Sequence, residues 1–467
     1  MRAGFYETEI VPPLGTTIFG YPRKRVNSGV TLKLYAKAVV VESEGKKAAL
    51  LVLDCGGLPK DLPEKVIERV CSMSDIERDS ILLAATHAHT SGPYHRGLGS
   101  FVHKPRLEGE PLLDAELDDK AIDMTILKAA DAIILANQRL EEVHIKFAMG
   151  AAKDISYVRE YYINDGTIRT NPGYCKDDIV KPYSEPETDL PVFFFTDKEG
   201  RPKGAITSFA LHHDTVSGCE MSSDFSGVVA RNMKRLFGDE FITLFFAGFC
   251  GNINHLDFMG EKQGKPFKKT AEEIGGVLTR ELLQALTEAE PLADDSLCIK
   301  KELMAIPKRK LPDGLLERVK ELKKNPPTTN RCTIAEPYGD GMLYAHAQSV
   351  LNDYEKDTRT VYDIPVMVVK LGDCMLYSFV GEMFSQFADK IRANSPSKKN
   401  LMIELSNSSD PSPYIPIPEL YDVPTVYEAS IYEDSLVKEA GDMMVDRALE
   451  LAKEMYQEGN HYARRIL

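Results

Sequence analysis

The stretch ILLAATHAHTSGPYH, Ile81–His95, passes from a run of apolar residues into a polar loop with three histidines. The apolar run up to Ala85 is typical of a buried β-strand, and the Gly92-Pro93 pair marks a turn. The whole chain of 467 residues contains only ten histidines, so this loop holds an unusual share of them. The stretch therefore predicts a buried strand whose end carries polar chemistry.

Similar apolar segments alternate with helical patterns through the first half of the chain, which is typical of an α/β fold. The predicted strands cover residues 34–43, 48–54, 80–86, 141–152, 189–197, 204–212 and 241–249. The predicted helices cover residues 60–74, 114–140, 222–238 and 268–286. Because several strands are continuous runs of Val, Ile, Leu and Phe, we expect a sheet that is covered on both faces.

The second half of the chain begins with a change in composition. From residue 298 to residue 357 it becomes charged and amphipathic, as in LLERVKELKKN, and we expect a helical insertion or cap over residues 298–357. IPVMVVKLGDCMLYSFVGE follows, two apolar runs joined at Gly372-Asp373, which predicts a β-hairpin. Further helices are predicted over residues 382–395 and 433–457.

Charge and hydropathy exclude several classes of protein. The chain has 57 Lys and Arg against 71 Asp and Glu, a net charge of −14. Nucleic-acid binders need clustered Lys and Arg, so we expect no nucleic-acid partner. The longest apolar runs are far shorter than the roughly 20 residues that span a bilayer, and MRAGFYETEI lacks the apolar core of a signal peptide. We therefore expect a cytoplasmic protein without stable membrane association.

Two predicted strands end in histidine pairs. If the extended conformation persists, His87 and His89 point to one side of their strand. His212 and His213 are neighbours and face opposite sides, so only one of them is the expected ligand. Neutral imidazole is a common zinc ligand, whereas the eight cysteines include no C-x-x-C pair. The alternative is that these are surface histidines without a metal.

Further polar residues have both a structural and a chemical interpretation. Glu382, at the start of a predicted helix, either complements the helix dipole or completes a two-histidine zinc site. Tyr414 and Tyr427 lie in a Pro-rich loop, where ordinary packing is the default. Residues 222–224, Ser-Ser-Asp, are expected to cap a helix. Residues 247–257, AGFCGNINHLD, fit a close backbone approach to a ligand but lack the G-K-[ST] ending of a phosphate loop.

Taken in order along the chain, these segments resemble the catalytic domain of the neutral, non-lysosomal ceramidases and their bacterial relatives. The resemblance is carried by AGFYETEIVPPLGTTIFGY, LYAKAVVVES, LVLDCGGL, THAHTSGP, FALHHDT, SSDFSG, GFCGNINH, VGEMF and PYIPIPELYDVPTVYEAS. It implies a mixed central sheet flanked by helices, in one catalytic domain over residues 1–467. We expect no counterpart of the C-terminal immunoglobulin-like domain of true ceramidases.

The resemblance also implies roles for individual residues. The implied zinc ligands are two histidines, a glutamate and a tyrosine: His87, His212, Glu382 and Tyr414. His89 matches the second histidine of the family's THxH run and is the expected proton-transfer residue. Tyr427 and Arg159 are expected to stabilise an oxyanion.

Three features depart from the family pattern. The family carries a serine in a G-D-V-S-P-N run where this chain has Asn254, which cannot be a nucleophile. THAHTSGP has one residue more than the usual run, and Val158 replaces the asparagine that precedes Arg159 in relatives.

The expected function is that of a zinc-dependent hydrolase. A metal-activated water would attack a carbonyl carbon, in particular that of an amide, in a small soluble substrate. Two alternatives remain open: a true ceramidase that hydrolyses N-acylsphingosine, and a homologue that binds a metal or ligand without turnover.

Overall fold

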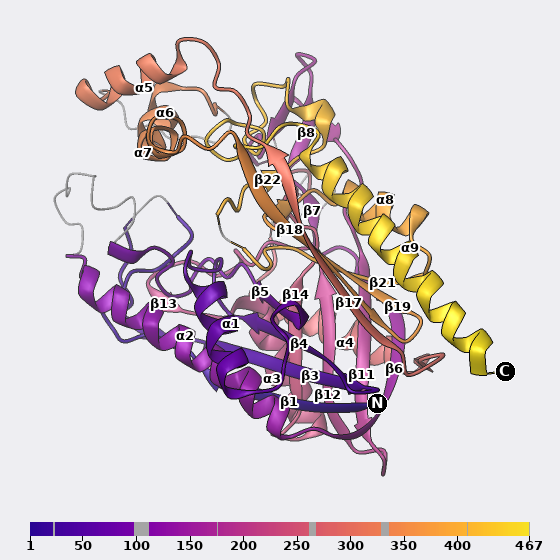
Figure 1. Ribbon diagram of the computed structural model, residues 1–467. Helices are drawn as coiled ribbons and strands as arrows, with labels where there is room; N and C mark the ends of the chain where they lie inside the picture. The colour runs from indigo at the N-terminus through magenta and orange to yellow at the C-terminus, as the bar shows by residue number, and fades with distance from the viewer. Residues whose placement is uncertain are drawn as a thin grey trace.

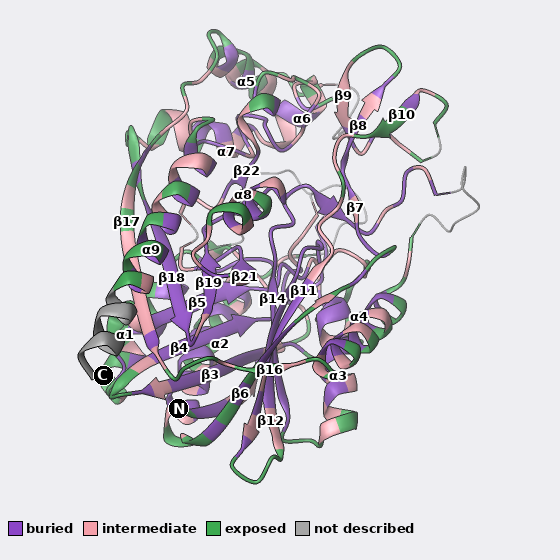
Figure 2. Ribbon diagram, turned by 90° about the vertical axis from the view of Figure 1, so that its right-hand side faces the viewer, coloured by how far each residue is buried: buried purple, intermediate pink, exposed green. Residues whose placement is uncertain are grey.

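The computed structural model in Figure 1 describes residues 1–21, 24–97, 112–174, 176–260, 268–327, 336–408 and 410–466. Two β-sheets pack face to face, and helices cover the outer face of each, which gives four layers (Figures 1 and 2). The predicted α/β class with a mixed central sheet is confirmed. Within the described ranges, no helix combines the length and the apolar character needed to cross a bilayer.

The larger sheet has nine strands in the described part of the chain, in the order β14-β12-β11-β6-β1-β3-β4-β5, with β16 paired to β6. They are β1 (Arg2–Glu9), β3 (Tyr35–Ser43), β4 (Lys46–Leu53), β5 (Ile81–Ala85), β6 (Glu141–Ala151), β11 (Asp189–Asp197), β12 (Pro202–Phe209), β14 (Ile242–Ala247) and β16 (Glu290–Pro291). The pairs β4–β5 and β12–β14 are parallel, and the other pairs are antiparallel. All seven strands predicted in the first half are confirmed, while the central β1 was not predicted.

Both faces of this sheet are buried, which explains the continuous apolar runs. In β3, Ala38 and Val40 face one cluster and Val39 and Val41 face another. The first face packs against α1 (Leu62–Met73), α2 (Ala115–Gln138), α3 (Asp224–Phe237) and α4 (Ala271–Leu286). The predicted helices of the first half are therefore confirmed.

The second sheet covers the other face and consists of β17 (Leu297–Pro307), β18 (Val361–Leu371), β19 (Cys374–Ser378) and β21 (Lys399–Ile403), in that order. The predicted hairpin joins β18 to β19 at Gly372, whose φ of 59° suits glycine. On the outside lie α8 (Gln386–Asn394) and α9 (Ala440–Ile466). Both begin later than predicted, because residues 382–383 form a strand and residues 433–439 a loop.

The predicted helical insertion over residues 298–357 is wrong at its start. Leu297–Pro307 form β17, which pairs with all of β18. β17 is an edge strand of the described sheet, and its charged residues Lys300, Lys301 and Glu302 are half-buried, so the segment resembles an amphipathic helix in sequence. In the described residues of this range, the helical segment comprises α5 (Leu315–Lys324), α6 (Asp340–Ala345), α7 (Ala347–Leu351) and a π-helical turn, Asn352–Lys356, which project from the sheets at the top of Figure 1.

Short elements connect the layers. They are β2 (Gly29–Val30), β7 (Tyr157–Val158), β8 (Glu160–Ile163), β9 (Ile168–Thr170), β10 (Ile179–Pro182), β13 (Glu220–Met221), β15 (Ile253–Asn254), β20 (Glu382–Met383), β22 (Tyr414–Ile415) and the 3₁₀ turns Arg78–Ser80 and Pro418–Leu420. The two edge strands of the larger sheet, β5 and β14, are joined by the residues that follow β21. Glu404 N donates to Ala247 O (3.1 Å), and Ala85 N donates to Leu405 O (3.2 Å).

Candidate metal centre

Three histidine side chains converge beyond the carboxyl ends of β5 and β12. His87, His89 and His212 each offer a ring nitrogen, and these atoms lie within 4.8 Å of one another. The ring of His87 is central, with its centroid 4.7 Å from that of each of the other two. His87 and His212 are buried, and His89 is half-buried. The three side chains could hold a metal ion.

The histidines of the first pair meet through a turn and not through strand alternation as predicted. β5 ends at Ala85, and His87 has a φ of 70°, in the left-handed region that a residue with a β-carbon seldom adopts. His89 N donates to His213 O (2.9 Å), which ties this turn to the end of β12. Such a backbone conformation persists only where the surroundings hold it, as they do here.

Each of the three rings is locked in one tautomer. The Nδ1 atoms lie against backbone carbonyl oxygens: His87 against Gly56 (2.7 Å), His89 against Gly20 (2.9 Å) and His212 against Cys250 (2.9 Å). Since a carbonyl oxygen only accepts, each Nδ1 donates its hydrogen, and in the neutral ring Nε2 keeps a lone pair. Metal-binding histidines are usually oriented in this way.

Glu382 adds a carboxylate oxygen to this set of donor atoms. Its Oε2 lies 3.3 Å from His87 Nε2 and 3.1 Å from His212 Nε2, and it is a buried oxygen without a hydrogen-bond partner. Lone pairs that face each other in a buried site are costly unless a proton or a cation lies between them. Ligands of a tetrahedral zinc ion, with bonds of about 2.0–2.1 Å, lie about 3.3 Å apart. The site therefore fits such an ion.

Tyr414 reaches the same cluster from the neighbouring strand. The parallel pair β20–β22 places Glu382 directly opposite Tyr414. Tyr414 Oη lies 3.3 Å from His212 Nε2, and the rings of the two residues are nearly parallel. The structure thus brings the four predicted ligands together. It adds His89, whose Nε2 lies 3.1 Å from His87 Nε2.

Burial and mutual charge set the protonation of the cluster. Burial acts to raise the pKa of Glu382, but His87 and His212 outweigh it and hold that pKa well below its usual value. Burial lowers the pKa of His212 to about 4, and burial together with the other two histidines holds the pKa of His89 well below 6.5. For His87 the Glu382 carboxylate overcomes the opposing effect of burial and raises the pKa. At neutral pH the carboxylate is ionised, and His89 and His212 are neutral.

The structure is similar to the crystal structure of neutral ceramidase from Pseudomonas aeruginosa, with a TM-score of 0.66 and 16% identity over 97% of this chain and 74% of that chain. This chain has the neutral ceramidase fold. A ceramidase complexed with C2 is similar as well, with a TM-score of 0.69 and 15% identity over 98% of this chain and 75% of that chain. No protein-family profile and no curated protein matches the sequence. The resemblance that the motifs indicated is confirmed at the level of the fold.

Arg159 and Tyr427, the other predicted catalytic residues, lie beside the cluster of this ceramidase fold. Arg159 is buried and donates from Nη1 to Tyr414 Oη (3.1 Å), while its Nε forms an ion pair with Glu428 Oε1 (3.1 Å). The Tyr427 ring centroid lies 6.1 Å from that of Tyr414. Tyr427 Oη donates to Glu433 Oε1 (2.5 Å), so its proton points at this carboxylate.

Several local predictions around the histidine cluster can now be compared with the structure. His213 stacks on Phe225 at 4.0 Å, so one histidine of its pair joins the cluster, as expected. The predicted cap at residues 222–224 is confirmed in part. Ser223, at the N-cap, makes no side-chain capping bond, but Ser222 Oγ accepts from Asp224 N (3.1 Å) and Asp224 Oδ1 accepts from Phe225 N (2.7 Å), both at the start of the helix. Asn254 donates to Asn171 Oδ1 (3.0 Å).

The residues that hold the ligands in place were not predicted from the sequence. Gly20 and Gly56 act through backbone carbonyls, and Cys250 does the same. The signal that could have indicated one of them is the Gly-rich segment 247–257. The backbone of this segment does come close to a neighbour, but the neighbour is another part of the protein and not a ligand. A β-carbon at Gly251 would lie 2.4 Å from Glu382 O.

We expect Gly251→Ala to weaken zinc binding by about tenfold or more, because the added methyl group must displace the Glu382 backbone that carries a predicted ligand. Titration with a fluorescent zinc chelator would measure the affinity. Gly276→Ala in α4 is the matched control, since a β-carbon there meets no atom within 4 Å. It should leave zinc binding unchanged and stabilise the helix by about 1 kcal/mol. Equal zinc affinity in the two variants would contradict the expectation.

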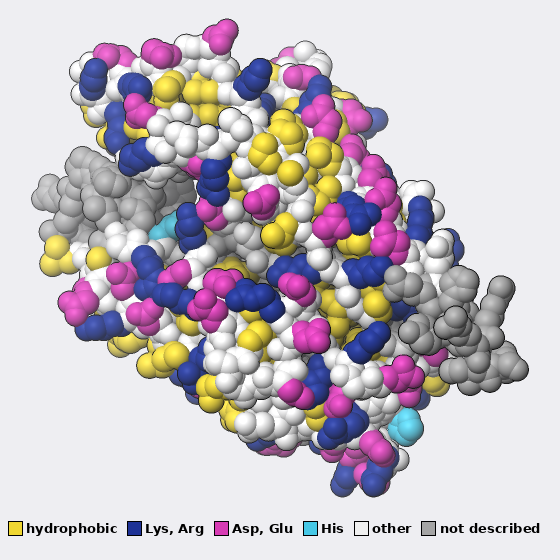
Figure 3. Space-filling model, in the orientation of Figure 1, with side chains coloured by type: hydrophobic (Ala, Val, Ile, Leu, Met, Phe, Trp, Pro, Cys, Tyr) yellow, Lys and Arg dark blue, Asp and Glu magenta, His cyan; other side chains and the backbone are white. Residues whose placement is uncertain are grey.

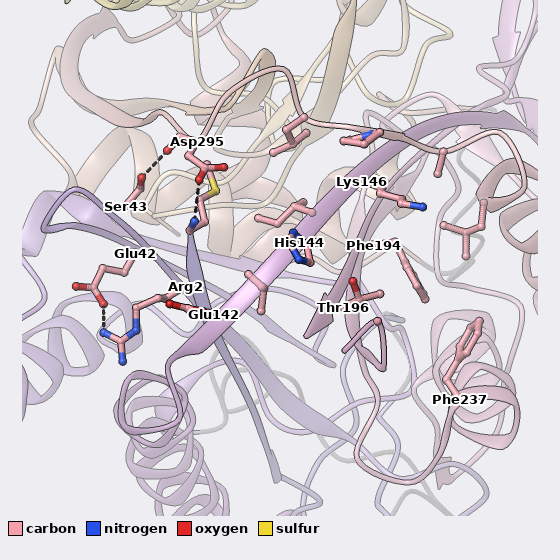
Figure 4. Close-up of a pocket in the computed structure, with 18 of the residues that line it drawn as sticks. Arg2, Glu42, Ser43, Glu142, His144, Lys146, Phe194, Thr196, Phe237 and Asp295 are labelled. Carbon is pink, nitrogen blue, oxygen red and sulfur yellow. Dashed lines mark hydrogen bonds and ion pairs between the residues drawn. The ribbon is translucent and has the colours of Figure 1, made fainter. Parts of the chain in front are cut away.

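A separate cavity of about 1210 Å³ lies away from this centre (Figure 4). His144 and Lys146 of β6 and Phe194 and Thr196 of β11 line it. Arg2 forms an ion pair with Glu42 at its edge (2.7 Å). None of the predicted site residues lines this cavity.

Proposed function

We propose that this protein is a zinc-dependent hydrolase that cleaves an amide bond in a small soluble N-acyl compound. The observation that carries the proposal is the convergence of His87 Nε2 and His212 Nε2 on Glu382 Oε2, a buried oxygen without a hydrogen-bond partner. His87, His212, Glu382 and Tyr414 would hold the ion. When bound, zinc would supply Lewis-acid chemistry that makes water nucleophilic near neutral pH.

His89 is the proposed proton acceptor. Its Nδ1 hydrogen is held by Gly20 O, so Nε2 is the free basic atom, and this atom faces the cluster 3.1 Å from His87 Nε2. Burial lowers its pKa, so at neutral pH the ring is neutral and Nε2 carries a lone pair. His89 is also less buried than His87 and His212, which suits a group that exchanges protons with substrate.

Arg159 and Tyr427 are proposed to act on the substrate side of the centre. Arg159 orients Tyr414 through the bond to its Oη and brings a positive charge close to the place where an oxyanion would form. Tyr427 can donate to an oxyanion only when its hydroxyl turns away from Glu433. Glu433 therefore sets the resting direction of the Tyr427 proton.

The absence of a side-chain nucleophile at position 254 supports attack by water. The Asn254 side-chain amide donates to Asn171, and its Oδ1 accepts from Leu256 N (2.9 Å). Both ends of this amide are used in holding the loop, and an amide is in any case a poor nucleophile. The proposed reaction needs no covalent intermediate on the protein.

The choice of a small soluble substrate rests on charge. A net charge of −14 is repelled by anionic lipid surfaces, which attract clustered Lys and Arg. On the face in Figure 3, Lys and Arg side chains are interspersed with Asp and Glu. The cytoplasmic location, the small-molecule partner and the lack of a nucleic-acid partner predicted from the sequence remain part of this proposal. Ceramide is the second candidate substrate, because the two similar structures are both of ceramidases.

A substrate panel tests the proposal. Purified protein, loaded with one equivalent of zinc, is assayed against N-acyl amino acids, short N-acyl amines and a short-chain fluorescent ceramide. We expect turnover of a soluble compound that stops on chelation and returns with zinc. Ceramide turnover that equals the best soluble rate would overturn the substrate preference. Zinc binding without turnover of any compound would favour a non-catalytic binding protein.

A further inference from the structure

Glu404 is a fully buried carboxylate at the end of β21 that lies close to the metal centre without touching a proposed ligand side chain. Its Oε2 accepts from Cys250 N (3.0 Å) and Met383 N (2.9 Å), and its Oε1 accepts from Cys250 Sγ (2.9 Å). In the described part of the chain it forms no ion pair with Lys or Arg. Burial raises the pKa of this carboxyl group well above its usual value, so its charged form is costly to bury there.

The two backbone N–H groups that donate to Glu404 belong to residues that each contact or adjoin a proposed ligand. Cys250 donates to Glu404 through its N–H, while its carbonyl oxygen accepts from His212 Nδ1 (2.9 Å). Met383 donates to the same oxygen and is bonded to Glu382 in sequence. One carboxylate oxygen therefore ties together the two segments that aim His212 Nε2 and Glu382 Oε2 at each other.

The neighbouring residue extends this connection to the third ligand segment. Leu405 N donates to Gly381 O (2.9 Å), one residue before Glu382. Leu405 O accepts from Ala85 N (3.2 Å), two residues before His87. The segment 404–405 thus contacts the backbone next to three of the four proposed ligands, although it supplies none itself.

We propose that Glu404 is a positioning residue whose carboxylate sets the separation of the His212 and Glu382 ligand atoms and thereby the affinity of the site for zinc. The inference rests on the proposed zinc site and deepens it. We expect position to matter more than charge, because both important donors are backbone N–H groups, from which a neutral carbonyl oxygen also accepts. The alternative is that Glu404 contributes only to folding.

Two variants separate position from charge. Glu404→Gln keeps the length and one acceptor oxygen for Cys250 N and Met383 N, and its amide nitrogen can face Cys250 Sγ. Glu404→Asp keeps the charge but withdraws the oxygens by one methylene. We expect Glu404→Gln to bind zinc within about threefold of wild type and Glu404→Asp to bind it about tenfold more weakly, as for other residues that orient metal ligands.

The readout is the zinc dissociation constant of folded protein, obtained by chelator competition, with circular dichroism as the check of folding. Asp197→Asn is the matched control, because Asp197 Oδ1 also accepts from two backbone N–H groups, those of Glu199 (3.0 Å) and Arg201 (2.9 Å), at the far end of β11. It should not change zinc affinity. A role in folding alone lowers the melting temperature of the variants and leaves their zinc affinity at the wild-type value.

The outcomes are distinct. Glu404→Asp within about threefold of wild type, or Glu404→Gln weakened as much as Glu404→Asp, would overturn the inference while the zinc site stands. Wild-type protein that binds no zinc would overturn the proposed function and this inference with it. If Glu404→Asp does not fold, Cys250→Ala, which removes the Oε1 partner, is expected to weaken zinc binding by more than about threefold, and unchanged affinity would again count against the proposal.

Discussion

Replacing His87 by alanine is expected to abolish zinc binding, with zinc content falling from about one equivalent in the wild type to below about one tenth. His87 Nε2 is the central atom of the site, 3.1 Å from His89 Nε2 and 3.3 Å from Glu382 Oε2. Its loss removes a ligand and also the ring that separates the other two histidines. Zinc content after dialysis, measured by mass spectrometry, is the test, and hydrolysis should be lost in parallel.

His144→Ala provides the matched control for this experiment. His144 is an exposed histidine of β6 that lines the separate cavity of Figure 4, so the variant changes the same residue type without touching the cluster. It should retain the wild-type zinc content. Comparison of the metal-free proteins by circular dichroism shows whether each variant is folded. Equal zinc in His87→Ala and His144→Ala would remove the basis of the proposed centre.

The sequence predicted the layers well where strands are buried on both faces. Val39 and Leu50 lie in such strands, whose continuous apolar runs are typical of a strand that is buried on both faces. β1 and β17 were missed for opposite reasons. β1 carries polar residues such as Glu7 and Glu9 at its end, where it leaves the core. β17 is an edge strand of the described sheet, and its half-buried Lys300 and Lys301 resemble the charged face of an amphipathic helix in sequence.

The site was predictable to the extent that its residues follow strand ends. His87 and His212 come directly after apolar runs, and the order of the motifs indicated Glu382 and Tyr414. The contact between the last two depends on the pairing of β20 with β22, two-residue strands that leave no periodic signal. The carbonyl oxygens that fix the imidazoles were beyond prediction for the same reason, since every residue has one. Only the fold determines which of them faces a ring.

Arg159→Met is expected to lower the free energy of unfolding by about 3–5 kcal/mol, because it removes one partner of a buried ion pair. The side chain of Arg159 is 9% exposed and that of Glu428 is fully buried. Glu160 is buried too, and neither of its carboxylate oxygens has a hydrogen-bond partner. In the described structure no other Lys or Arg pairs with Glu428 or Glu160. The variant would therefore leave two buried carboxyl groups without a positive partner.

The loss of stability in Arg159→Met should grow with pH, because the pKa values of Glu160 and Glu428 are both affected. Burial raises the pKa of Glu160 and of Glu428, and Arg159 opposes both shifts. Without Arg159 these pKa values rise further, so above a pH of about 4.5 the folded variant holds protons that the unfolded chain releases. Stability therefore falls as pH rises, and the variant should lose more at pH 8 than at pH 5.

Urea unfolding at both pH values, with chelator present so that bound metal adds nothing to stability, measures the effect. Arg201→Met is the matched control, because Arg201 also pairs with a buried carboxylate, that of Asp197 (2.6 Å), but its own side chain is 72% exposed. Breaking such a solvent-screened pair should cost no more than about 1 kcal/mol and should change little with pH. A loss in Arg159→Met as small as that in Arg201→Met, or one equal at pH 5 and pH 8, would mean that solvent or a proton already neutralises Glu428 and Glu160. In that case the role of Arg159 would lie in the proposed reaction and not in stability.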